Sequence, residues 1–226
     1  MYSLNLKNIF QKSRDYLKIT VIDSGLGGIT YAKNVKKSLV DLDIELLIDK
    51  DGFPYGKKDL NWLKERLEYL VNNSKTNVLV IACNTLSSLI FYYDLKFKKT
   101  VVDVITPTIY FLLGQNFNHI CILATKNTIK MKVFDLLLDK NIYYLDATDL
   151  ILDIENKSDY ENSFNDLILQ IPSTCDCLVL GCTHLIKIKD VFKKRLDLFV
   201  LSQDGLFIEL FNKNNYIVSE KSDFNA

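Results

Sequence analysis

Two stretches of the sequence follow the same pattern, VLVIACNT at residues 78–85 and CLVLGCTH at residues 177–184. Each contains a short apolar run, a small residue, a cysteine and two polar residues. A short, uninterrupted apolar run is typical of a strand buried on both faces of a parallel sheet. We therefore expect Cys83 and Cys182 to lie where two such strands end. Ligands bind at this edge of open α/β sheets, so the pattern predicts one site with a sulfur on each side.

Strand-like and helix-like segments alternate along the rest of the chain. Further strands are predicted at residues 18–23, 44–49, 101–105, 119–124, 142–145 and 198–201. A helix is predicted to about residue 72, with Asp59 as its N-cap. This alternation indicates an α/β fold of mostly parallel sheets flanked by helices. Residues 18–105 and 119–201 repeat one plan, which predicts two pseudo-symmetric lobes with a cleft between them.

The sequence also suggests how the chain is divided. We expect an N-terminal arm or helix (1–17), a first lobe carrying Cys83 (18–105 with a C-terminal segment of about 202–226) and a second lobe carrying Cys182 (106–201). Residues 146–160 are acidic and are expected to be irregular. Because no linker-like segment separates the lobes, they should pack closely.

The composition excludes several classes of partner. The 28 Lys and Arg residues balance the 28 Asp and Glu residues, so no overall field attracts nucleic acid or an anionic membrane. No apolar run approaches the roughly 20 residues of a membrane span. The N-terminus lacks the apolar core of a signal peptide, and five cysteines without a disulfide-like framework suit a reducing compartment. We therefore expect a cytoplasmic protein.

The two cysteines have competing interpretations. Most free cysteines are buried small hydrophobes, but such residues need no Asn-Thr or Thr-His after them. A thiolate that reacts with a polar substrate needs such polar neighbours, because amide, hydroxyl and N–H groups can bind the substrate carboxylate. A zinc site is disfavoured, since Cys177 and Cys182 would lie roughly 16 Å apart on a strand with a rise of about 3.3 Å per residue.

Polar residues at other strand ends extend the candidate site. Asp23 could simply cap a turn, or it could orient or deprotonate a thiol across the cleft. The Gly25–Gly28 turn is a poor dinucleotide fingerprint and fits close approach to a small anion better. His184 follows Cys182 closely and could tune its thiol, whereas His119 is expected to be structural.

Four motifs together resemble glutamate racemases of the cofactor-independent aspartate/glutamate racemase superfamily. They are Asp23-Ser24-Gly25 with Gly27-Gly28, Pro54-Tyr55-Gly56, Cys83-Asn84-Thr85 and Gly181-Cys182-Thr183-His184. They occur in the family's order with similar spacing, over roughly residues 18–205. The Gly-Cys-Thr-His and Pro-Tyr-Gly motifs look like those of glutamate rather than aspartate racemases.

The resemblance implies interconversion of L- and D-glutamate for peptidoglycan, without a cofactor or a metal, and homodimers are common in the family. On the family pattern the acid/base residues are Cys83 and Cys182, assisted by Asp23 and His184. The substrate-contacting positions are Asp23, Ser24, Tyr55, Gly56, Asn84, Thr85, Thr183 and His184. Glu155 matches a family glutamate that pairs with the histidine.

The chain departs from the family at a few positions. Leu86 stands where a small residue is usual, Ile186 replaces a proline, the segment after His184 is short, and an N-terminal arm is added. Alternatives are therefore a racemase for another amino acid, such as aspartate, a one-cysteine hydrolase or decarboxylase of the superfamily, or a weak or inactive glutamate-binding descendant.

Overall fold

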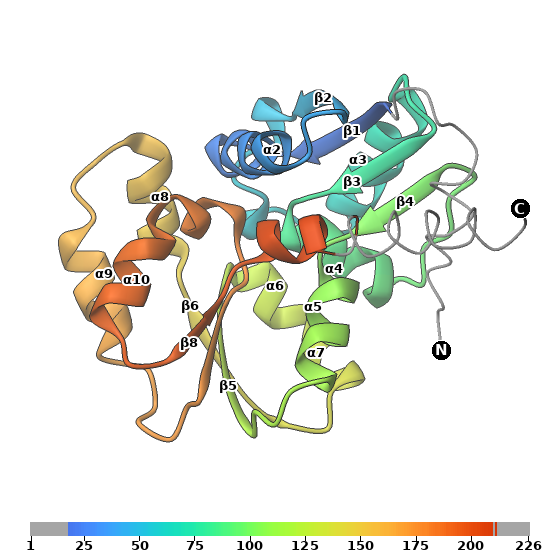
Figure 1. Ribbon diagram of the computed structural model, residues 1–226. Coiled ribbons are helices and arrows are strands. Elements are labelled where there is room, and N and C mark those ends of the chain that lie inside the picture. Colours follow the sequence, from blue (N-terminus) through green and yellow to red (C-terminus); the bar gives the residue numbers. More distant parts are fainter. Residues whose placement is uncertain (1–17, 210, 212–226) are drawn as a thin grey trace, which may run out of the picture.

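Two four-stranded parallel sheets form the framework of the protein (Figure 1), whose computed structural model describes residues 18–209 and 211. The first sheet has the order β2 (Asp43–Ile48), β1 (Lys18–Asp23), β3 (Val78–Ile81), β4 (Thr100–Asp103). The second has the order β6 (Asn141–Asp146), β5 (His119–Ala124), β7 (Cys177–Leu180), β8 (Phe199–Leu201). The predicted two-lobe α/β fold is confirmed, and the shared strand order is the repeat expected from the sequence.

Helices connect the strands within each lobe. The first lobe has α2 (Leu26–Ser38), α3 (Leu60–Asn73), α4 (Asn84–Tyr92), α5 (Ile105–Leu113) and the 3₁₀ turns η1 (Lys50–Gly52) and η2 (Tyr55–Lys57). The second has α6 (Lys126–Met131), α7 (Val133–Leu137), α8 (Thr148–Asn156), α9 (Glu161–Ile168), η3 (Thr183–Ile188) and α10 (Lys189–Arg195). Asp59 caps α3 as predicted, since its carboxylate accepts hydrogen bonds from the Asn61 and Trp62 N–H groups at 2.9 and 3.0 Å.

The two lobes share one hydrophobic core. Buried side chains of the first sheet, such as Ile22 and Ile81, belong to the same cluster as Ile120 and Val179 of the second. The outer face of each sheet has a smaller cluster of its own beneath the surface helices. The lobes are therefore packed closely, as expected for a chain without a linker.

One segment differs from its prediction. Residues 146–160 are not irregular, because residues 148–156 form α8. Leu150, Ile151 and Ile154 recur on one face of this helix and are buried in the second lobe, while its acidic residues lie elsewhere. The predicted arm at residues 1–17 lies outside the described residues, as do 210 and 212–226.

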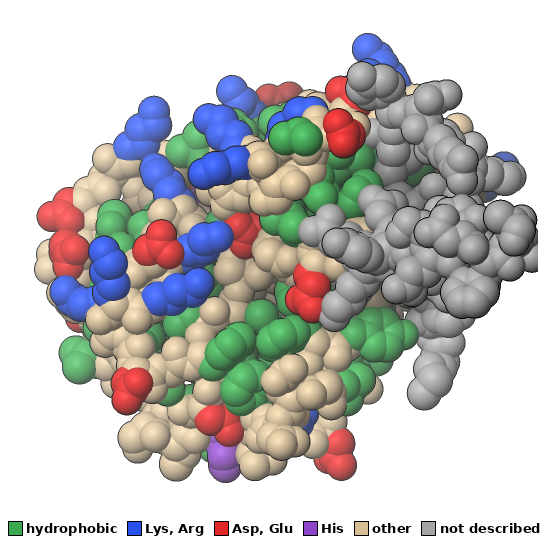
Figure 2. All heavy atoms as spheres, viewed as in Figure 1, with side chains coloured by type: hydrophobic (Ala, Val, Ile, Leu, Met, Phe, Trp, Pro, Cys, Tyr) green, Lys and Arg blue, Asp and Glu red, His purple; other side chains and the backbone are tan. Residues whose placement is uncertain are grey.

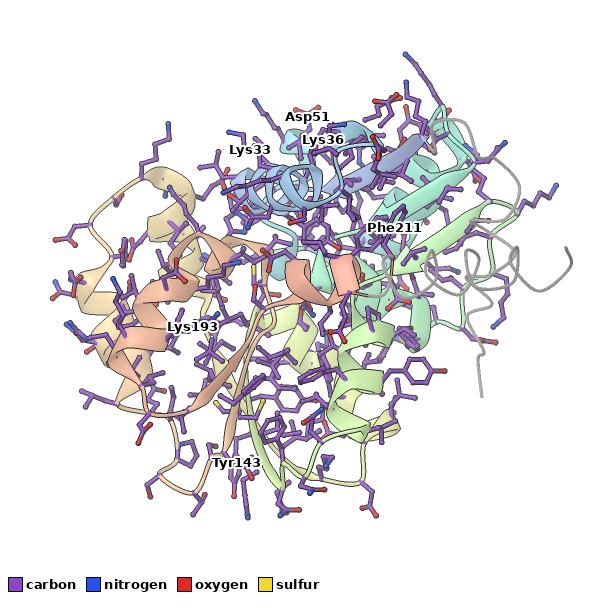
Figure 3. The ribbon with its side chains drawn as sticks, viewed as in Figure 1. Lys33, Lys36, Asp51, Tyr143, Lys193 and Phe211 are labelled. Carbon is purple, nitrogen blue, oxygen red and sulfur yellow. The ribbon has the colours of Figure 1, made fainter. Side chains whose placement is uncertain are left out.

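The surface helices are amphipathic. Lys33 on α2 and Lys193 on α10 are exposed, and Lys36 on α2 donates hydrogen bonds to the Val40 and Leu42 carbonyls at 2.7 Å (Figure 3). Figure 2 shows Lys and Arg side chains, with some Asp and Glu among them, along the upper and middle left of this face. Tyr31 and Val35 on the opposite side of α2 are fully buried against the first sheet. Within the described part of the chain, no helix combines the length and the apolar character needed to cross a membrane.

Candidate active site

A small cavity of about 30 Å³ lies between the carboxyl edges of the two sheets. Cys83 and Cys182 both line it, each from its own lobe and each 8% exposed. They occupy equivalent positions, two residues beyond the last residue of β3 and β7. The cavity is also lined by the other residues expected at the site: Asp23, Ser24, Tyr55, Gly56, Asn84, Thr85, Thr183 and His184.

Asp23 ends β1 and joins the two lobes. Its Oδ1 atom accepts hydrogen bonds from the Ser24 and Gly25 N–H groups at 2.6 and 3.2 Å. Its Oδ2 atom accepts one from the Thr183 hydroxyl at 3.0 Å. Burial raises the pKa of this carboxyl, and the charge of His184 and these hydrogen bonds oppose the rise. Asp23 is thus a buried carboxyl group that lines the cavity and is held by three hydrogen bonds.

His184 connects Cys182 to Glu155. Its Nδ1 atom lies 3.5 Å from Cys182 Sγ, and its Nε2 atom lies 2.7 Å from Glu155 Oε2. Burial acts to lower the pKa of His184, but the hydrogen bonds with Cys182 and Glu155 overcome this and raise it to about 10. The hydrogen bond with His184 also lowers the pKa of Glu155. This geometry favours an imidazolium held between a sulfur and a carboxylate.

The glycine-rich turn lets the lobes approach each other. A Cβ atom on Gly27 would come within 2.6 Å of the backbone nitrogen of His184 and would also overlap the Thr183 hydroxyl. At the start of α2, the Leu26 N–H group donates a 2.9 Å hydrogen bond to Glu155 Oε2. A carboxylate of the second lobe therefore binds at this helix N-terminus, and the small anion expected at the turn stays a prediction.

A partly buried ion pair between Arg66 and Asp49 supports the loop that contains Tyr55. The Tyr55 hydroxyl donates a 2.5 Å hydrogen bond to Asp49 Oδ2, and Arg66 binds both oxygens of the same carboxylate at 2.8 and 2.5 Å. Burial raises the pKa of Asp49, but the bonds from Arg66 and Tyr55 outweigh it and leave the pKa below its usual value. The Tyr55 hydroxyl is thus used within the protein, and Gly56 packs against Thr125 of the other lobe.

Polar side chains after Cys83 also cross between segments. The Thr85 hydroxyl lies 3.0 and 3.1 Å from the hydroxyls of Thr125 and Thr128 in the second lobe. Asn84 forms two hydrogen bonds with Gln203, a residue beyond β8. Both side chains line the cavity, so each combines a structural bond with access to its interior.

Cys83 lies in a different electrostatic environment from Cys182. Burial raises the pKa of the Cys83 thiol well above its usual value, and the nearby charge of Asp23 raises it further. Hydrogen bonds from the backbone near the start of α4 oppose this effect only in part. The structure thus places one sulfur beside a buried carboxyl and the other beside an imidazole.

The sequence analysis missed several residues of the cavity wall. They are Phe53, Lys57, Thr125, Thr148, Ile151 and Leu152, whereas Pro54 and Gly181 belong to the motifs named in the sequence analysis. The Phe53 ring packs against His184 with 5.8 Å between ring centroids. The internal repeat could have identified Thr125, because it follows β5 as Ser24 follows β1. Within the described residues, no group of three or more His, Cys, Asp or Glu side chains could hold a metal ion.

Comparison with known proteins gives one consistent result. The glutamate racemase of Aliarcobacter butzleri is 32% identical over 196 residues, which cover 79% of this chain and 75% of the relative. The glutamate racemase of Fusobacterium nucleatum is 30% identical over 203 residues, with 81% and 75% covered. The crystal structure of the Francisella tularensis glutamate racemase with D-glutamate has a TM-score of 0.75 at 25% identity, covering 90% and 82% of the two chains. No family model matches the sequence.

Proposed function

The chain belongs to the glutamate racemase family, and from this premise we propose that it interconverts L- and D-glutamate without a cofactor, using Cys83 and Cys182 as its two acid/base residues. The observation that carries this proposal is that two thiols at equivalent strand ends line one cavity from different lobes. We further propose that the product D-glutamate serves peptidoglycan synthesis in the cytoplasm and that the protein acts as a homodimer.

Racemisation requires a base and an acid on opposite faces of the α-carbon. One cysteine thiolate removes the α-proton and becomes a thiol, and the electron pair stays on the substrate as a carbanion. The other cysteine gives its proton to the opposite face and becomes a thiolate. After the turnover the first cysteine is a thiol and the second is a thiolate, which is the state required for the reverse reaction. Two thiols therefore serve both directions without a third reactant.

The geometry supports different starting states for the two sulfurs. A positive imidazolium close to a sulfur favours the thiolate, and His184 lies in this position beside Cys182. Cys83 is buried beside Asp23, which favours its thiol. We infer that one cysteine starts as the thiolate and the other as the thiol, and that the roles swap with the direction of the reaction. Glu155 holds His184 in its charged form, and Asp23 assists Cys83 when the roles reverse.

The carbanion needs stabilisation from the walls of the cavity. The candidate donors are the hydroxyls of Ser24 and Thr85 and the N–H groups at the start of α4, which border the small cavity. A cavity of about 30 Å³ holds only about two water molecules, so binding of glutamate must enlarge it.

Two of the departures from the family pattern fall outside the cavity. Leu86 and Ile186 are both buried in the hydrophobic core, and neither lines the cavity. They alter packing around the site rather than the groups that would touch the substrate. No observation therefore favours an inactive descendant or a one-cysteine enzyme over a racemase.

The decisive experiment follows α-proton exchange of each glutamate enantiomer in D₂O by NMR and racemisation by circular dichroism. Wild type should incorporate deuterium and racemise glutamate, and aspartate should be a far poorer substrate. Cys83→Ala and Cys182→Ala should each lose racemisation by a factor of at least about 10³. Cys175→Ala changes a buried thiol outside the cavity and should leave the rate unchanged. Racemisation that survives the loss of either cavity cysteine would refute the two-cysteine proposal.

A further inference from the structure

Gln203 lies outside the cavity but directly behind one of its walls. It follows β8, where the chain crosses from the second lobe toward the first (Figure 1). Its side chain is 1% exposed and does not line the cavity. Asn84, the residue after Cys83, is 2% exposed and does line it. The two residues are 119 positions apart in the sequence, yet their side chains are paired.

The two carboxamides bind each other in both directions. The Asn84 Nδ2 group donates to Gln203 Oε1 at 2.6 Å, and the Gln203 Nε2 group donates to Asn84 Oδ1 at 2.9 Å. This arrangement uses one N–H of Asn84 and one lone pair of its oxygen. One N–H and one lone pair of Asn84 are therefore still free to bind other groups.

The surroundings of Gln203 decide which way its carboxamide faces. The Thr108 hydroxyl donates its proton to the Val104 carbonyl at 2.7 Å, so its oxygen can only accept from Gln203. Gln203 Nε2 lies 3.1 Å from this oxygen and 3.4 Å from the Val104 carbonyl oxygen. Both neighbours are acceptors, which requires the nitrogen of Gln203 at this place and leaves its oxygen for Asn84.

We propose that Gln203 is a positioning residue, which fixes the orientation of the Asn84 carboxamide so that its free N–H and free lone pair meet the substrate in a defined order. An amino acid carries a carboxylate, which accepts hydrogen bonds, and an ammonium group, which donates them. A carboxamide held in one orientation matches these two groups, whereas a rotated one opposes both. The inference rests on the proposed function, because it assigns to Asn84 a contact with the amino acid.

The test compares two Gln203 variants and one control by racemisation kinetics. Gln203→Leu should raise KM for glutamate about tenfold and change kcat less than about twofold, because a contact made equally in the ground and transition states is lost. Gln203→Asn keeps an amide that is too short to reach Asn84, and it should give the same result if the leucine variant folds poorly. Ser88→Ala removes a buried hydroxyl of α4 that has no hydrogen-bond partner among the described residues and does not line the cavity, and its KM should stay within about twofold of wild type.

A double-mutant cycle separates positioning from general packing. If Gln203 acts through Asn84, adding Gln203→Leu to Asn84→Ala should raise KM by less than about threefold beyond Asn84→Ala alone. Additive effects, or an unchanged KM in both Gln203 variants, would overturn the inference while leaving the racemase proposal intact.

A binding measurement keeps the two proposals distinguishable. The Kd for glutamate is measured by calorimetry on wild type and Gln203→Leu. A wild type that binds glutamate without exchanging its α-proton would end the catalytic proposal, but a tenfold weaker Kd in the variant would still support positioning. A wild type that binds no glutamate would overturn both.

Discussion

Replacing Glu155 with glutamine tests the role of charge around Cys182. In wild type, His184 Nε2 lies 2.7 Å from Glu155 Oε2. Glu155→Gln is nearly isosteric and keeps an oxygen that can accept this hydrogen bond. It removes only the negative charge. Because an opposite charge at this distance shifts a pKa by about 1–3 pH units, the pKa of His184 should fall from about 10 by about 1–2 pH units.

The size of the effect depends on pH. At pH 7 the imidazolium form should predominate in both proteins, so kcat/KM should change less than about twofold. At pH 9 the wild type still holds most of its imidazolium, whereas the variant has lost half of it or more. The variant should therefore be about two- to tenfold less active there, and the alkaline limb of its pH profile should move down by about 1–2 pH units.

Two measurements check this prediction. The chain contains only two histidines, so NMR titration follows His184 directly with His119 as an internal reference. The second measurement is kcat/KM as a function of pH, followed by circular dichroism, which shows where activity falls on the alkaline side. Asp153→Asn removes another carboxylate from α8 that does not line the cavity, and it should match wild type. An unchanged His184 titration in Glu155→Gln would refute the reasoning.

The same pair links pH to stability. The folded-state pKa of His184 lies above its unfolded value of 6.5, so its contribution to stability is complete below pH 6.5. This contribution declines as pH rises and is lost as pH passes through about 10. The melting temperature of wild type should therefore fall over this range, and that of Glu155→Gln should fall less.

Two further predictions concern packing around the site. Gly27→Ala should lower the free energy of unfolding by about 1–3 kcal/mol or more and reduce activity, because its Cβ would overlap Thr183 and the His184 backbone. Gly114→Ala, whose nearest contact would be 3.5 Å away, should change stability by less than about 0.5 kcal/mol in the same denaturant experiment. Tyr55→Phe should lower stability by about 1–2 kcal/mol, because Asp49 loses a buried hydrogen-bond donor. The loss should be measurable at neutral pH by denaturant unfolding and should shrink as acid protonates Asp49; an equal loss at low pH would contradict this role.

The sequence contained enough information to predict the residues at strand ends. A buried parallel strand produces an apolar run that is visible locally, and the residue after the run must lie at the edge of the sheet. Cys83 and Cys182 could therefore be assigned to one cavity before any coordinates were known. The error at residues 146–160 came from reading acidic residues as irregular, although Leu150, Ile151 and Ile154 already recur at helical spacing.

Residues that act through distant partners could not be predicted in this way. Gln203 binds the site residue Asn84, and Arg66 binds Asp49, which in turn holds the site residue Tyr55. The sequence around Gln203 and Arg66 shows no special pattern. Such pairs depend on how the helices and connecting segments pack against the sheets. The local sequence around either residue does not contain this information. The internal repeat is the one long-range signal available, and it would have added Thr125 as the counterpart of Ser24.

The repeat also shows where the two halves of the site differ. Asp23 at the end of β1 corresponds to Ala124 at the end of β5, and His184 corresponds to Thr85. The charged groups thus gather around the glycine-rich turn, where Glu155 joins them, while the equivalent contacts in the other half are made by threonine hydroxyls.

This asymmetry matters for the proposed chemistry. Two thiols in identical surroundings would have equal proton affinities, and the states with two thiols or two thiolates would be populated along with the mixed one. Only the mixed state has both the base and the acid that one turnover requires. The imidazole beside Cys182 and the buried carboxyl beside Cys83 make the surroundings of the two sulfurs unequal. A fold that repeats its backbone can therefore perform a two-sided reaction because its charges are not repeated.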